Sequence, residues 1–145
     1  MTAALPSPVD TRTRWQRVRG PTFLAVGVLV AGLLLHLRDP HRGGSWGLCP
    51  WLFLTGTYCP GCDGLRAVND LTHGDVSDAV SSNLLVVAST PVLVLWWGRT
   101  TLDRWQGRVR AVSPRRQVTF ASALFALAIA FAVLRNTPFG AWLAP

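Results

Sequence analysis

The stretch "VTFASALFALAIAFAVL", residues 118–134, is a continuous run of apolar and small residues without a formal charge. Two other runs have the same character: "TFLAVGVLVAGLLLHL" (22–37) and "NLLVVASTPVLVLWW" (83–97), the latter extending back to a start near Val76. A helix needs about 20 such residues to cross a bilayer. Flanking arginines and tryptophans can extend each run into the headgroups. None of these helices would have the polar face of a soluble bundle, so the runs predict an all-α integral membrane protein with three transmembrane helices.

The remaining sequence is divided by these runs. Half of the 145 residues are hydrophobic, and the chain has room for one domain. We expect a flexible, arginine-rich cytoplasmic segment at 1–20 and a single membrane domain at 21–145. That domain is expected to contain spans at about 22–37, 76–97 and 118–134, an outer cysteine lid at about 38–75, and a cytoplasmic arginine-rich loop at 98–117. The sequence after the first run lacks a small-x-small cleavage pattern, so an uncleaved anchor is favoured over a signal peptide.

The arginines predict the orientation. Ten of the fourteen basic residues lie before the first run or between the second and third: Arg12, Arg14, Arg17, Arg19, Arg99, Arg104, Arg108, Arg110, Arg115 and Arg116. Cytoplasmic loops are enriched in basic residues, so we expect a cytoplasmic N-terminus and an extracytoplasmic lid and C-terminus, in the inner (plasma) membrane. The net charge of +7 is then explained by topology, and no nucleic-acid partner is expected.

The segment between the first two spans is too apolar for a simple loop. "SWGLCPWLFLTGTY" (45–58) is nearly uncharged but too short to cross as a helix, which indicates an interfacial or re-entrant run. The following "DGLRAVNDLTHG" (63–74) has the spacing of a short amphipathic helix that ends at Gly74. Asp75 is then positioned to cap the next helix. The outer segment is therefore predicted to be a structured lid.

The lid carries all three cysteines of the chain, Cys49, Cys59 and Cys62. The Pro60–Gly61 pair favours a type II turn, which brings the Cα atoms of Cys59 and Cys62 within about 7 Å. Three chemistries remain open. A disulfide would staple the lid. Zinc would be bound by the three thiolates with His73 as a candidate fourth ligand.

The third chemistry is a thiol–disulfide couple of Cys59 and Cys62, with Cys49 as the resolving thiol. The helix that follows, together with Arg66, favours a thiolate, whereas the charge of Asp63 opposes it. His36 and His41 are interpreted as interfacial residues rather than catalytic bases.

The motif "LCPWLFLTGTYCPGCDGLRAVNDLTHGD", followed by a span and by "LRNTPFGAWL", resembles the small bacterial membrane proteins grouped as domain of unknown function 2752. The resemblance covers roughly residues 45–140. It implies a similar size, few spans and a cysteine motif, but no activity. The family commonly has glycine directly after the second motif cysteine, where this chain has Asp63. A metal knuckle often needs a positive φ at that position, which aspartate tolerates less well than glycine.

These observations lead to one favoured function and two alternatives. The favoured function is a non-enzymatic membrane component whose lid is fixed by a disulfide or a metal and binds a partner. The alternatives are a membrane thiol–disulfide oxidoreductase and a protein that binds zinc or another metal. Residues expected to support the site are Pro60, Gly61, Asp63, Arg66, Gly74 and Asp75. Small residues at four-residue spacing (Gly27 and Ala31; Ser122, Ala126 and Ala130) predict faces for a membrane-protein partner or a second copy.

Overall fold

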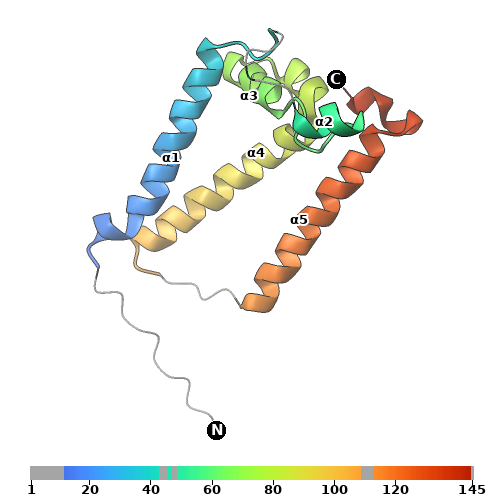
Figure 1. Ribbon diagram of the computed structural model, residues 1–145. Coiled ribbons are helices and arrows are strands. Elements are labelled where there is room, and N and C mark those ends of the chain that lie inside the picture. Colours follow the sequence, from blue (N-terminus) through green and yellow to red (C-terminus); the bar gives the residue numbers. More distant parts are fainter. Residues whose placement is uncertain (1–11, 43–45, 47–48, 109–112, 145) are drawn as a thin grey trace.

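The computed structural model describes residues 12–42, 46, 49–108 and 113–144. It contains the α-helices α1 (Arg14–Leu37), α2 (Pro50–Thr55), α3 (Gly64–His73), α4 (Val76–Trp105) and α5 (Pro114–Arg135), and the 3₁₀ helix η1 (Pro138–Leu143) (Figure 1). The described ranges contain no strand. The predicted all-α class is therefore confirmed, and the short amphipathic helix of the lid is present as α3.

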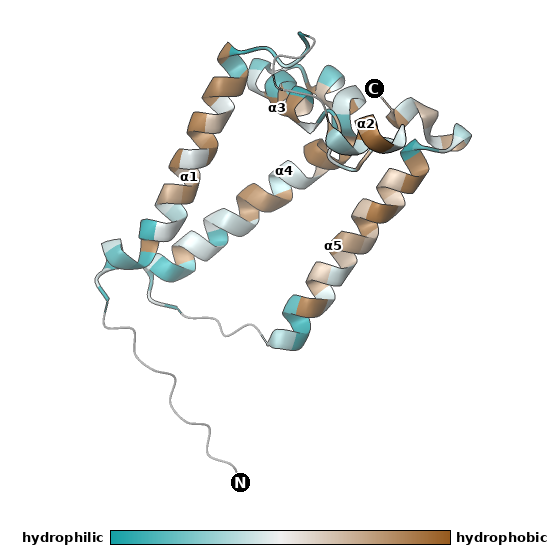
Figure 2. Cartoon of the chain, in the orientation of Figure 1, coloured by the Kyte–Doolittle hydropathy of each residue, from teal (hydrophilic) through white to brown (hydrophobic). Residues whose placement is uncertain are grey.

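Three helices, α1, α4 and α5, are long and apolar enough to cross a membrane. Hydrophobic residues cover most of their length, and hydrophilic residues lie at their ends (Figure 2). Most of these apolar side chains are exposed and few are buried, as expected where a helix contacts lipid rather than a protein core. The chain is thus a membrane protein with three spanning helices.

The helices extend beyond the apolar runs at their arginine-rich ends. α1 begins at Arg14 because Thr13 and Gln16 form a capping box, and α5 begins after Ser113, whose side chain caps the backbone N–H of Arg116. Part of the N-terminal segment expected to be flexible is therefore the start of α1. Residues 1–11 of that segment lie outside the described residues.

The spans are not packed into a closed bundle. α1 contacts α4, and α3 packs against both of them at one end (Figure 1). At the opposite end, the ring of Trp15 meets that of Trp105 edge to face at 5.3 Å. α5 stands apart along most of its length and contacts the rest of the protein through its C-terminal end and η1.

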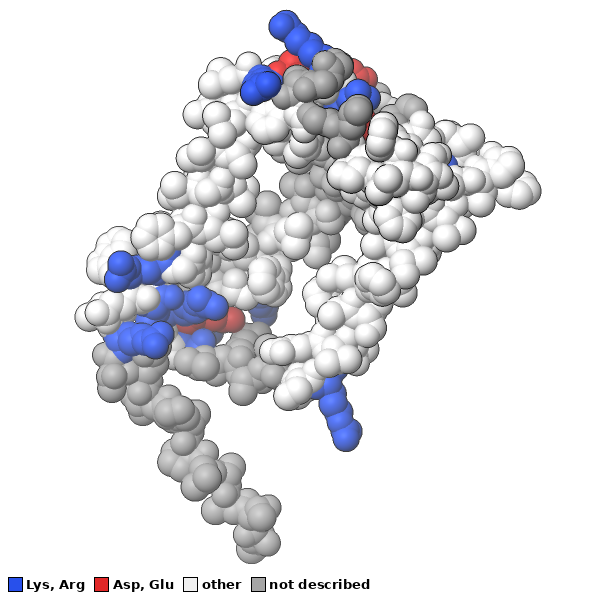
Figure 3. All heavy atoms as spheres, viewed as in Figure 1, with Lys and Arg blue, Asp and Glu red and all other residues white. Residues whose placement is uncertain are grey.

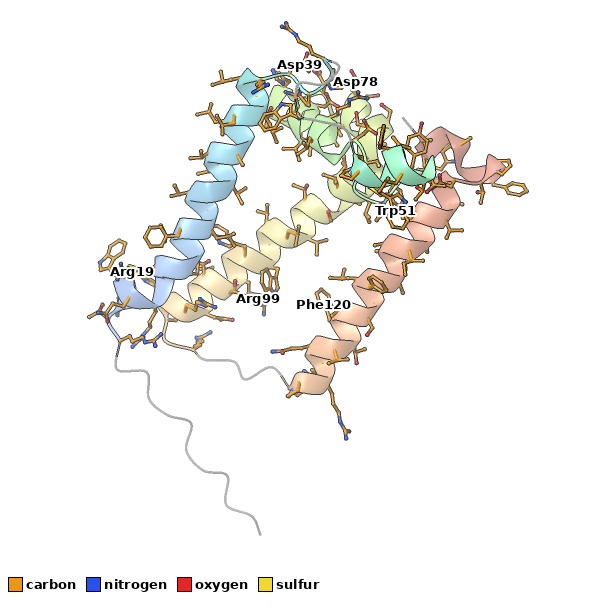
Figure 4. The ribbon with its side chains drawn as sticks, viewed as in Figure 1. Arg19, Asp39, Trp51, Asp78, Arg99 and Phe120 are labelled. Carbon is orange, nitrogen blue, oxygen red and sulfur yellow. The ribbon has the colours of Figure 1, made fainter. Side chains whose placement is uncertain are left out.

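Charge is distributed unevenly along the direction of the spans. Blue basic side chains gather where α1 begins and α4 ends, with little red among them, whereas blue and red side chains lie together at the opposite end (Figure 3). Arg19 and Arg99 lie at the basic end, whereas Asp39 and Asp78 lie with Trp51 at the other (Figure 4). The lid therefore lies at the less basic end of the molecule.

α4 is interrupted at Asn83, whose φ of −160° and ψ of 97° are not helical. Its side-chain Oδ1 accepts the backbone N–H of Val86 at 3.1 Å and so caps the helix that follows. That part, Leu84–Trp105, is about 33 Å long at 1.5 Å per residue, which matches the bilayer core. The sequence predicted a start near Val76, as observed, and Pro91 lies inside the helix. The non-helical backbone is at Asn83, so the turns from Val76 to Ser82 pack with the lid.

Candidate functional site

The three thiols of the lid form one cluster. Their sulfur atoms are separated by 3.6 Å (Cys49–Cys59), 3.0 Å (Cys59–Cys62) and 3.4 Å (Cys62–Cys49). Cys62 is buried, whereas Cys49 and Cys59 are partly exposed, and all three are free thiols. The sulfur atoms thus occupy the corners of a nearly equilateral triangle that can be reached from the surface.

Local backbone structure produces this arrangement. Cys49 precedes α2, which Pro50 opens and Gly56 ends in the left-handed conformation. Cys59 and Cys62 flank the Pro60–Gly61 turn, in which the Cys62 N–H donates to the Cys59 carbonyl at 3.2 Å. The Cys59 N–H in turn donates to the Cys62 sulfur at 3.2 Å. The turn therefore brings two sulfurs together, and the start of α2 adds the third.

Asp63 follows the turn with a φ of +59° and is the one non-glycine residue in the described ranges with a positive φ. A metal knuckle often needs this positive φ directly after its second cysteine, the position at which the family commonly has glycine. Its carboxylate pairs with Arg66 at 2.9 Å, one turn into α3. The ion pair reduces the opposition of the Asp63 charge to a nearby thiolate.

Two fully buried side chains hold the turn from the membrane side. The Asn83 Nδ2 donates to the carbonyls of Pro60 and Cys62 at 3.0 and 2.9 Å. The Arg135 Nη1 donates to the carbonyls of Cys59 and Cys62 at 3.2 and 3.1 Å, and its Nε donates to Leu143 at 3.1 Å. Asn83 belongs to α4 and Arg135 to α5, so two separate spans position the cysteine turn.

Arg135 is only 2% exposed, and its Nη2 has no hydrogen-bond partner. The guanidinium also contacts the faces of Tyr58 and Phe131, with 5.5 and 5.2 Å to the ring centroids. No carboxylate of the described residues pairs with it. A buried charge without a counter-ion costs several kcal/mol. Among the residues it hydrogen-bonds, only Cys59 and Cys62 have side chains that can become anions.

Asn136 provides a further link between α5 and the lid. Its Oδ1 accepts the Tyr58 N–H at 2.8 Å, and its Nδ2 donates to the Tyr58 carbonyl at 2.8 Å. The sequence interpretation missed Asn136 and the role of Asn83, and it included Arg135 only among the arginines that flank the apolar runs. The sequence offers two weak signals for these roles: Asn83 is a polar residue at the edge of the second apolar run, and Arg135 and Asn136 directly follow the third run.

The thiols differ in acidity. The N–H of Leu52, aimed at the Cys49 sulfur, lowers the pKa of Cys49, with smaller contributions from the neighbouring thiols. Burial raises the pKa of Cys62 to about 12, and hydrogen bonds to the Cys59 and Cys49 thiols add to the increase. The more reactive thiol is therefore Cys49, and Cys62 is the least reactive without a metal.

The other predicted site residues are dispersed. His73 does not join the thiols; its ring stacks on that of His36 at 4.1 Å in a separate pocket. Among the described residues, the group of ligand atoms close enough to hold an ion consists of the three cysteines alone. Gly74 ends α3 with a φ of +85°, and Asp75 precedes α4 without a side-chain cap hydrogen bond.

The fold and the cluster define a class: a membrane protein with three spanning helices and a three-thiol site that can hold a metal or form a disulfide. Residues 49–97 match the family model described as Protein of unknown function (DUF2752), the family that the sequence resemblance indicated. The match begins at Cys49 and ends in α4, so Arg135 and Asn136 lie outside it. No curated protein and no solved structure gives a significant match.

Proposed function

We propose that the protein is a non-enzymatic membrane component whose lid is fixed by a thiophilic metal ion, with zinc as the candidate. The ion is bound by Cys49, Cys59 and Cys62. The triangular arrangement of the sulfurs carries the proposal. Tetrahedral zinc with Zn–S bonds of 2.3 Å separates its sulfur ligands by about 3.8 Å. The observed separations of 3.0, 3.4 and 3.6 Å are all shorter than this value, so the sulfurs would move apart slightly to admit the ion. A disulfide would use two of the sulfurs and exclude the third.

Charge supports the same assignment. Three thiolates and a divalent ion together carry a charge of −1, which the buried Arg135 offsets from the side of the Cys59 and Cys62 carbonyls. Protein zinc sites with three protein ligands leave the fourth position to water or an external ligand. Because Cys49 and Cys59 are partly exposed, a donor from a partner can reach that position.

Metal content tests the proposal. Full-length protein purified in detergent without chelator should retain a thiol-bound ion that the Cys59→Ser variant loses, as measured by elemental analysis. Ser81→Ala is the matched control, since Ser81 is an exposed residue near the lid that bonds only its own helix. Equal metal content in wild type and Cys59→Ser contradicts the proposal.

A thiol–disulfide oxidoreductase is the second candidate. The observation that favours it is the lowered pKa of the partly exposed Cys49, 3.6 Å from Cys59. This changes the roles expected from the sequence, because Cys49 becomes the attacking thiolate and Cys59 the resolving thiol. In that case a Cys59→Ser variant should trap a mixed disulfide through Cys49, detectable on a non-reducing gel. If Cys49 forms no mixed disulfide in the Cys59→Ser variant, the oxidoreductase function is ruled out.

We also propose that the basic end faces the cytoplasm and that the lid is extracytoplasmic in a bacterial plasma membrane. Supporting this, three separate helix ends place arginines at the same end of the molecule, and the aspartates of the lid lie at the other (Figure 3). A membrane-impermeant maleimide should label the reduced cysteines in intact cells. Labelling only after the membrane is opened would reverse the orientation. The small-residue stripe of α5 remains a prediction for contact with a partner.

A further inference from the structure

We propose that the lid has a second metal site, separate from the thiols, at which the imidazoles of His36, His41 and His73 bind a divalent ion of borderline softness such as Co²⁺, Ni²⁺ or Zn²⁺. This site goes beyond the proposed function and does not depend on it. Imidazole nitrogen is a ligand of choice for these ions.

The first observation is convergence. The chain has three histidines, and all of them line one hollow of about 210 Å³. They come from the last turn of α1, the loop after it, and the last turn of α3. The other lining residues are Asp39, Asn69, Asp70 and Asp75. The hollow thus combines neutral nitrogen ligands with carboxylates at one place on the lid surface.

The second observation is that hydrogen bonds fix the tautomers of the stacked pair. The His73 Nδ1 is 2.9 Å from the Asn69 carbonyl, which can only accept, so Nδ1 carries the hydrogen. Thr72 donates its hydroxyl hydrogen to the same carbonyl at 2.6 Å, so its oxygen accepts from the His36 Nδ1 at 3.2 Å. In both neutral rings Nε2 is therefore the bare nitrogen that can bind a metal.

His41 is oriented in a different way. Its Nε2 is 2.7 Å from the Oδ1 of the buried Asp70, whose Oδ2 accepts the Ser82 hydroxyl at 2.9 Å. A carboxylate that holds one imidazole nitrogen leaves the other as the ligand, and such carboxylate–histidine pairs are typical of the surroundings of metals. The bare nitrogen of His41 is therefore Nδ1.

The three rings must move to bind one ion. Within the described ranges only the thiols have ligand atoms that all lie within 4.8 Å of one another. The rings of His36 and His73 are already 4.1 Å apart and nearly parallel at 17°. The side chain of His41 is 42% exposed and lies in the loop after α1, so no packed core opposes a shift of its ring that keeps the hydrogen bond to Asp70. Binding of an ion should separate the stacked pair.

Cobalt titration of the full-length protein in detergent tests this site. Cobalt bound to thiolate shows a ligand-to-metal charge-transfer band, whereas cobalt bound to imidazole and carboxylate does not. The Cys59→Ser variant should therefore still bind one Co²⁺ without that band, and addition of H36Q and H73Q should abolish this binding. The second site is overturned if the Cys59→Ser variant binds no cobalt. It is also overturned if adding H36Q and H73Q to Cys59→Ser leaves the cobalt binding unchanged. H36Q/H73Q with intact cysteines should keep the charge-transfer band, so the two proposals fail separately.

Thr72→Val provides a test that retains all three ligands. It removes the acceptor that holds the His36 Nδ1 and should weaken cobalt binding about 10- to 100-fold, the usual effect of losing an outer hydrogen-bond partner. An unchanged dissociation constant would contradict the proposed role of the His36 tautomer and with it the site.

Discussion

Replacement of Arg135 by methionine separates the role of its charge from the stability of the turn. The substitution removes the hydrogen bonds to the carbonyls of Cys59, Cys62 and Leu143 and keeps an unbranched apolar side chain. Asn83 still holds Cys62 and Pro60. The turn should therefore persist, while the positive charge beneath the thiols is lost.

The magnitude follows from two opposing terms. Three hydrogen bonds from a charged donor contribute about 1.5–3 kcal/mol each. Removing a buried guanidinium that no described carboxylate offsets recovers several kcal/mol of desolvation. The metal-free protein should therefore lose little stability. The metal-bound cluster carries a net negative charge, and loss of Arg135 should weaken metal binding about 10- to 100-fold. This corresponds to about 1.4–2.7 kcal/mol.

A competition titration against a chromophoric chelator measures the affinity, with the protein in detergent. Arg135→Lys keeps the charge without the planar donors and should give an intermediate value. Arg116→Met is the matched control, because it removes an arginine at the opposite, exposed end of α5. If Arg135→Met binds the metal as tightly as wild type, Arg135 is not the counter-charge of the cluster.

Three further outcomes are expected. Asn83→Leu removes the cap of the membrane part of α4 and a hydrogen bond to Cys62, and it should lower the unfolding temperature in detergent. Asn83→Asp keeps the capping oxygen but not the donor, so it should lower this temperature less. Gly140→Ala should destabilise η1, since the added Cβ would overlap the Leu134 carbonyl; unchanged proteolysis of the C-terminus would contradict this. In metal-free reduced protein, Cys49 should be alkylated first and Cys62 last as the pH is raised, because the pKa of Cys49 is lowered and that of Cys62 is raised. Peptide mass spectrometry measures this order.

The parts of the fold that the sequence predicted correctly depend on local signals. Apolar run length specified the three spans, and helical spacing with Gly74 specified α3 and its end. The predicted type II turn is wrong, because Gly61 does not have the positive φ that this turn requires. The left-handed residue is Asp63, directly after the second motif cysteine. The helix ends were longer than predicted, since capping by Thr13 and Ser113 allows helices to continue into polar sequence.

The parts that the sequence did not predict depend on contacts between distant segments. Arg135 reaches the Cys59 carbonyl across 76 positions, and Asn136 reaches Tyr58 across 78. No periodicity encodes such a contact. The histidine pocket was missed for the same reason: His36 and His73 end two different helices, and only the packing of α3 against α1 stacks their rings. His73 was a candidate fourth ligand of the thiols because tetrahedral zinc accepts three sulfurs and one imidazole.

The distribution of buried residues supports the proposal that a metal or a covalent link fixes the lid. In the described part of the chain, the apolar side chains of the spans face outward, and few large hydrophobic residues are buried. The interior beneath the lid is instead largely polar, with Asn69, Asp70, Asn83 and Arg135 each bonded to backbone or side-chain partners. Hydrogen bonds contribute little net free energy compared with apolar burial, and small folded units without an apolar core generally depend on metals or disulfides. Loss of the thiol-bound ion should therefore unfold the lid while the three spans, held by the bilayer, remain helical.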